Sequence, residues 1–180
     1  MFKKTVLATL LLSATSSIFA MQSSTPYVGA SVGVNVNSST SVNGNAGVYR
    51  GVPLKVFAGY GGVINPSFYL AGELTGVPGS AQMSNKNNMR TSYGFGMSLL
   101  PGLMLSDQTL AFMRAGFVRT EFSNVNNMAT GGQLGVGIQT FLTQNVDLRG
   151  EYDYTAYRTV SGIPAPSADS YYLGLVYKFN

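Results

Sequence analysis

Charged residues alternate along one short stretch of the chain, where Arg149, Glu151 and Asp153 occupy every second position. Residues two apart in an extended strand point to the same face, so the guanidinium and both carboxylates would share one side. Two neighbouring carboxylates could bind a metal ion, or they could form ion pairs with Arg149 and Arg114. The second interpretation is favoured, because charges held away from water need partners of opposite sign.

The chain contains no histidine and no cysteine. Histidine is the usual general base and the commonest metal ligand, and cysteine is required for disulfides and thiolate chemistry. The glycine-rich segment 131–137 lacks the lysine and the following helix of a phosphate-binding loop. We therefore expect no enzyme activity, no catalytic or metal site and no cofactor.

The composition indicates a protein whose outer surface faces something other than water. Charged residues make up 10% of the chain, whereas an average soluble domain has about 25%. The 22 glycines, 11 tyrosines and 10 phenylalanines do not fit ordinary disorder. The formal net charge is +4, but no run of lysines or arginines forms a patch for phosphates, so we expect no nucleic-acid partner.

The first twenty residues have the order of a secretory signal peptide. Lys3 and Lys4 precede a short apolar run, and small residues lead up to Ala20. A membrane-anchoring helix is the alternative, but the apolar run is shorter than the roughly 20 residues that a span needs. We predict a signal peptide at residues 1–20, cleaved near Ala20, and a single domain at residues 21–180.

Eight segments of that domain alternate apolar residues with glycine, small polar or charged ones, which is typical of strands with two different faces. The segments are Tyr27–Asn37, Gly51–Gly61, Phe68–Gly76, Thr91–Met104, Leu110–Phe122, Gln133–Leu142, Val146–Tyr154 and Ser170–Asn180. The glycines suit the crowded interior of a narrow barrel, and only a closed barrel lets strands cross lipid with every backbone group paired. We predict an all-β fold, an eight-stranded antiparallel up-and-down transmembrane β-barrel.

Long and short connectors alternate between these segments. Residues 37–50, 77–90 and 156–169 are long and rich in serine, asparagine, glycine or proline, and 123–132 is intermediate. The other connectors are short. Outer-membrane barrels have external loops at one end and tight periplasmic turns at the other, so we expect the long connectors outside the cell.

Over nearly all of residues 21–180 the chain resembles the OmpA-like and opacity-type family of small outer-membrane barrels. The segments with the strongest resemblance are Phe68–Leu74, Phe112–Phe117, Leu148–Tyr154 and Tyr171–Phe179. The resemblance implies eight strands in the cell outer membrane, both termini in the periplasm and loops at the cell surface. It also implies a signal for the barrel-assembly machinery, formed by Tyr171, Leu173, Leu175, Tyr177 and Phe179.

Six charged residues share the glycine-bearing faces of the predicted strands, at similar distances from the short connectors. They are Lys55, Glu73, Arg114, Arg149, Glu151 and Asp153. Three are cations and three are anions, so the set can neutralise itself inside a narrow barrel. We predict that they meet across the lumen as a plug of ion pairs that closes the pore and fixes the strand register.

The resemblance favours a structural or adhesion role at the cell surface, exerted through loops that contact a host or matrix ligand. Outer-membrane lipid, lipopolysaccharide and the barrel-assembly machinery are the other expected partners. A narrow pore for small solutes is the alternative, although eight strands leave an interior that side chains can fill. A soluble exported β-sandwich is a third interpretation, and it differs from a barrel in needing no detergent for extraction.

Overall fold

The computed structural model describes residues 23–40, 46–85, 91–122, 125–158 and 167–179. The predicted signal peptide at residues 1–20 lies outside the described residues. No helix in the described part of the chain is long and apolar enough to cross a membrane.

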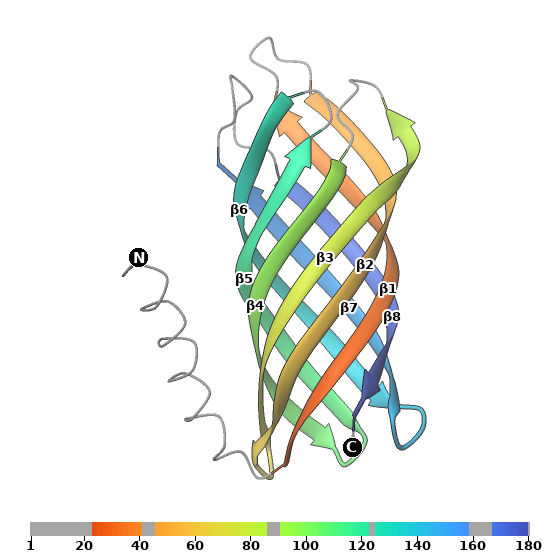
Figure 1. Ribbon diagram of the computed structural model, residues 1–180, viewed down its shortest axis with the longest axis vertical. Coiled ribbons are helices and arrows are strands. Elements are labelled where there is room, and N and C mark those ends of the chain that lie inside the picture. Colours follow the sequence, from red (N-terminus) through yellow and green to blue (C-terminus); the bar gives the residue numbers. More distant parts are fainter. Residues whose placement is uncertain (1–22, 41–45, 86–90, 123–124, 159–166, 180) are drawn as a thin grey trace, which may run out of the picture.

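Eight antiparallel strands form one closed barrel in which each strand pairs with its neighbours in the sequence and β1 pairs with β8 (Figure 1). The strands are β1 Ser23–Thr40, β2 Ala46–Asn65, β3 Phe68–Asn85, β4 Thr91–Ser106, β5 Thr109–Phe122, β6 Val125–Phe141, β7 Val146–Tyr157 and β8 Ser167–Lys178. The predicted fold class is therefore confirmed. Closure leaves no strand with an unpaired edge, as a barrel in lipid requires.

The two faces of the strands differ as the alternation predicted. Leu74, Phe117 and Leu134 point away from the barrel axis, with 61–69% of their surface exposed. Arg114 and Asp153 point into the lumen and have no exposed surface. An apolar outer face matches lipid, and the lumen collects the polar and charged side chains.

Short turns connect β2 to β3, β4 to β5 and β6 to β7 at one end of the barrel, which also holds the start of β1 and the C-terminal end of the chain (Figure 1). At the first turn, the Asn65 side-chain oxygen accepts hydrogen bonds from the backbone N–H groups of Ser67 and Phe68, at 3.1 and 2.9 Å. This Asx turn satisfies backbone donors that the ladder leaves free. We call this end of the barrel the turn end.

At the opposite end the strands run further than predicted. β1 and β2 pair as far as Thr40 and Ala46, β3 continues to Asn85 and β6 already begins at Val125. The predicted bounds of the connectors 37–50, 77–90 and 123–132 are therefore wrong. A strand crosses the hydrocarbon with about 9–11 residues. Beyond it both faces can meet water, so the apolar alternation that marks a strand disappears there while the backbone ladder continues.

Candidate functional site

The structure brings the six predicted lumen residues together into one cluster. Lys55 lies 3.0 Å from Glu151 and 3.2 Å from Asp153, measured from Nζ to the carboxylate oxygens. Arg114 contacts Glu73 at 2.5 Å and also pairs with Glu151. All of these side chains have less than 5% of their surface exposed. We call this set, with Arg149, the lumen cluster.

The lumen cluster connects strands on opposite sides of the barrel. Glu73 on β3 accepts from Arg114 on β5 through one carboxylate oxygen and from Arg149 on β7 through the other, the second contact being 2.6 Å. β3 and β7 are four strands apart in a ring of eight. Removing one member would leave a buried charge without its partner, which is far more costly than the net value of the intact pair.

Glycines on the intervening strands let the charged side chains reach one another. Gly135 on β6 lies between Arg114 and Asp153 in the strand register. A Cβ atom at Gly135 would collide with a carboxylate oxygen of Asp153. On the other wall, a Cβ at Gly59 would collide with the ring of Tyr27, whose hydroxyl donates to Glu73 at 3.0 Å. Glycine at these two positions is therefore a requirement of the cluster.

Aromatic rings surround the Arg149 guanidinium, and sequence reasoning did not assign them this role. The guanidinium carbon lies 5.4 Å from the ring centroid of Tyr27, 4.6 Å from that of Phe57 and 5.1 Å from that of Phe112. Such contacts stabilise a cation. The alternation of residue types predicts that these three rings face the lumen. Their distance from Arg149 depends on the register between strands that are distant in the sequence.

The polar network continues from the lumen cluster toward the turn end, through three residues that the sequence analysis did not single out. Arg149 donates to the Gln139 side-chain oxygen at 2.9 Å, and the Gln139 amide donates to Asp147 at 2.6 Å. Asp147 in turn lies 3.0 Å from Lys178. Asp147 lies two residues before Arg149 on β7 and therefore on the same face of the strand. This spacing could have predicted that Asp147 faces the lumen.

Apolar side chains fill the same half of the lumen around this network. They are Tyr27, Phe57, Ala71, Leu100, Leu110, Phe112 and Val176, with Tyr69 and Met104 packed against them. This half of the barrel interior is therefore a packed core that contains a paired charge network.

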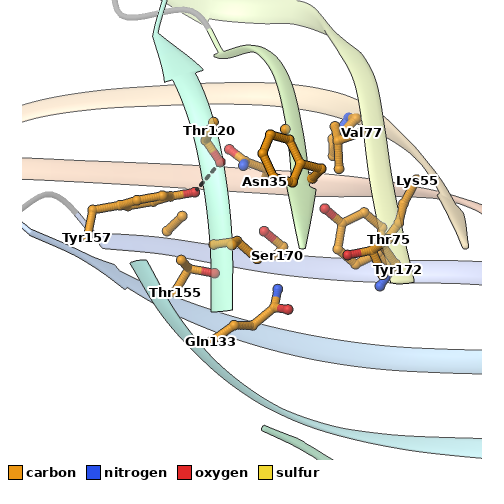
Figure 2. A pocket seen from close by; sticks show the side chains of 15 residues that line it. Asn35, Lys55, Thr75, Val77, Thr120, Gln133, Thr155, Tyr157, Ser170 and Tyr172 are labelled. Carbon is orange, nitrogen blue, oxygen red and sulfur yellow. Dashed lines mark hydrogen bonds between the residues drawn. The ribbon is translucent and has the colours of Figure 1, made fainter. Parts of the chain in front are cut away.

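The other half of the lumen contains a cavity of about 60 Å³ with both polar and apolar side chains in its lining. Figure 2 shows its lining, which includes Asn35, Thr155 and Ser170, and the contact of 3.2 Å between the hydroxyls of Thr120 and Tyr157. Lys55 of the lumen cluster also borders it. A space of this size with polar side chains in its lining can hold water. We therefore call this the wet half of the lumen and the half with the packed core the dry half.

The five residues predicted as an assembly signal lie on the outer face of β8 and just beyond it. Their exposed fractions range from 46% to 59%. The residues are Tyr171, Leu173, Leu175, Tyr177 and Phe179. The Phe179 backbone N–H donates to the Pro26 carbonyl at 3.0 Å, so the end of the chain is tied to β1 and its apolar row faces outward.

Glu151 and Asp153, the pair that could have bound a metal, face cations. Both lie within 3.2 Å of the Lys55 ammonium, and among the described residues no group of three metal-ligating side chains was found. The Lys55 ammonium therefore occupies the position between the two carboxylates that a metal ion would take.

Comparison with known families matches residues 6–179 to the outer membrane protein beta-barrel domain family. The chain belongs to this family. It is therefore an outer-membrane protein that crosses the bilayer with its eight strands. No sequence among the curated proteins matches it.

Solved structures of small outer-membrane barrels are similar to the chain. Neisserial surface protein A is 21% identical, with a TM-score of 0.57, covering 88% of this chain and all of that one. The attachment invasion locus protein of Yersinia pestis is 17% identical, with a TM-score of 0.49, covering 85% and 98%. OprG of Pseudomonas aeruginosa is 10% identical, with a TM-score of 0.48, covering 89% and 99%. At these identities the similarity concerns the fold alone.

Proposed function

We propose that the protein is a non-enzymatic surface protein of the outer membrane, with a structural or adhesion role exerted through the segments between its strands. The observation that supports this most is the lumen cluster. Its ion pairs join opposite walls of a barrel whose adjacent half is filled with apolar side chains. A lumen filled in this way favours an anchor for surface segments over a channel for solutes, and the cluster would close the pore and fix the strand register.

The difference between the two ends of the barrel supports the orientation that we propose. The turn end holds the short turns, the start of β1 and the chain's C-terminal end, and short turns belong on the periplasmic side of outer-membrane barrels. We place both termini in the periplasm and the opposite end outside the cell. Segments 41–45, 86–90 and 159–166, which would be external, lie outside the described residues.

Three partners accompany this role. Outer-membrane lipid and lipopolysaccharide would surround the apolar outer face, and the barrel-assembly machinery would read the outward row that ends at Phe179. A host or matrix ligand would bind the external segments, in keeping with the name of one structural neighbour, the Neisserial surface protein A.

Cell binding by the displayed protein tests the proposal. Bacteria that display the parent should bind immobilised matrix proteins or host cells more strongly than bacteria without it. Replacing 41–45 and 159–166 by glycine–serine segments of equal length should abolish the difference, and replacing the turn at 142–145 should not. An epitope near Asn43 or Pro164 should be labelled on intact cells, whereas one near Gln144 should be protected. Equal binding by cells with and without the protein would contradict the adhesion role.

A further inference from the structure

Arg119 and Arg158 flank Thr130 on the outward-facing side of the barrel, and we call these two arginines the arginine row. In the strand register Arg119 on β5 pairs with Thr130 on β6, and the Arg158 backbone N–H donates to the Thr130 carbonyl at 3.1 Å. All three residues are exposed, and Arg119 lies between the inward-facing Val118 and Thr120. Neighbouring strands are about 4.8 Å apart, so the two backbones are separated by about 10 Å.

Counting residues from the turn end puts the arginine row near the bilayer boundary at the opposite end of the barrel. β5 starts at Thr109 and β7 at Val146. Arg119 within β5, and Arg158 directly after the end of β7, therefore lie about as many residues from these starts as a strand needs to cross the hydrocarbon, roughly 9–11. A charge at this depth can reach the headgroups, whereas at the centre of the bilayer it would be costly.

The charges of this row have no described partner. No carboxylate of the described residues lies within ion-pair distance of Arg119 or Arg158. The nearest acidic residue along β5 is Glu121, two positions further on the same face. Among the described residues, no carboxylate therefore competes with an anion of the headgroup layer for these two guanidiniums.

An apolar groove begins directly next to the arginine row, on the side of the turn end. Its floor is formed by Ala115, Gly132 and Ala156, and its walls include Phe117 and Leu134. The register places Gly132 between Phe117 and Ala156. A Cβ atom at Gly132 would meet nothing within 4 Å, so the groove is open to the lipid.

A second apolar groove continues toward the turn end over the same strands. It includes the outward-facing Ala111 and Gly150 between the larger Met113, Val136 and Ile138. The two grooves thus extend along β5, β6 and β7 from the arginine row across the membrane-facing surface.

We propose that the arginine row and these grooves form a binding site for a phosphorylated, acylated glycolipid of the outer leaflet, the chemistry of lipopolysaccharide. The guanidiniums bind phosphate oxygens, for which their planar donor arrangement is suited, and an acyl chain lies in the groove over Gly132. The site rests on the proposed orientation, because only then does the arginine row meet the outer leaflet.

Titration with lipid A tests the site. The protein is extracted from outer membranes in mild detergent, freed of lipid and titrated with bisphosphorylated lipid A, with bound lipid counted by native mass spectrometry. We expect one tightly bound lipid A. The variant Arg119→Gln/Arg158→Gln should bind at least about tenfold more weakly, because charge-assisted contacts to phosphate are lost. Arg119→Lys/Arg158→Lys should retain most of the binding, and Gly132→Phe should weaken it by filling the groove.

Matched controls lie in another sector of the barrel. Arg50 is an exposed arginine on β2, and Gly72 on β3 is a second glycine whose added Cβ meets nothing within 4 Å. Arg50→Gln and Gly72→Phe should bind lipid A like the parent, and every variant should keep its heat-dependent gel mobility as evidence of a folded barrel. Equal binding by Arg119→Gln/Arg158→Gln and Arg50→Gln would overturn the proposal, as would equal binding of lipid A and its dephosphorylated form. Binding of lipid A by a protein that fails the cell-binding test still supports the site.

Discussion

The two halves of the lumen are formed by the same eight strands but differ in how they are filled. The half near the turn end contains Phe57, Phe112 and Arg149 in one packed core, with every charge of the lumen cluster paired. The other half contains a cavity bordered by neutral side chains such as Thr155 and Asn35, with Lys55 of the lumen cluster at its edge. The dry half needs paired charges and close packing, whereas water can satisfy the polar groups of the wet half. Substitutions should therefore have large effects in the first and small effects in the second.

The largest effect is expected at Arg114, which has no exposed surface and contacts both Glu73 and Glu151. Arg114→Ala leaves these carboxylates with fewer partners, and the free energy of unfolding should fall by about 3–5 kcal/mol. Urea unfolding in phosphatidylcholine vesicles, followed by tyrosine fluorescence or gel mobility, measures this.

Arg119 provides a control on the same strand, because its side chain is exposed on the outer face. Arg119→Ala should change the unfolding free energy by less than about 1 kcal/mol, as is usual for exposed charges. Equal losses for the two variants would show that the lumen cluster has no special role in stability.

An intermediate effect is expected where glycine makes room for a ring. A Cβ at Gly137 would collide with the Phe112 ring and lie 2.9 Å from the Gly150 carbonyl oxygen, whereas a Cβ at Gly150 itself meets nothing within 4 Å. Gly137→Val should therefore destabilise the barrel by about 1–3 kcal/mol through overpacking.

The paired control is Gly150→Val, on the neighbouring strand and the opposite face, which should be within about 0.5 kcal/mol of the parent. Comparing the unfolding midpoints of the two variants under the same conditions tests this. A similar loss of stability in both variants would mean that any glycine in a strand is needed equally, whether or not it makes room for a side chain in the lumen.

The smallest effect is expected in the wet half. Thr120 contacts the Tyr157 hydroxyl at 3.2 Å beside the cavity. Thr120→Val removes this contact, but water in the cavity can replace it, so the loss should not exceed about 1 kcal/mol. Thermal unfolding of Thr120→Val and Arg114→Ala under the same conditions compares the loss of stability in the two halves directly. A loss as large as that of Arg114→Ala would remove the distinction between them.

Much of this arrangement could be predicted from the sequence, because lipid outside and crowding inside impose opposite requirements on alternate residues. Lys55, Glu73 and Arg114 occupy the positions of their strands that alternate with the apolar ones, which predicted that they face the lumen. Counting residues from the short connectors predicted that they lie at similar depths. Charge balance then suggested pairing, and the contacts of the structure join the same residues.

Other features depend on information that the alternation does not contain. The register between strands, a long-range property, determines which ring lies beside Arg149 and which glycine lies beneath Tyr27. The bounds of β3 and β6 away from the turn end were missed for a different reason, since a strand that leaves the bilayer no longer needs an apolar face. The row of Arg119 and Arg158 was likewise visible only when β5, β6 and β7 were aligned.

In the proposed function, the lumen cluster and the surrounding core fill the barrel, so that it anchors surface segments and does not conduct. Single-channel recording of the parent protein in planar lipid bilayers tests this most directly. We expect a baseline without stable conductance steps from a sample whose heat-dependent gel mobility shows a folded barrel. Steady, reproducible channel openings by the folded parent protein would contradict it.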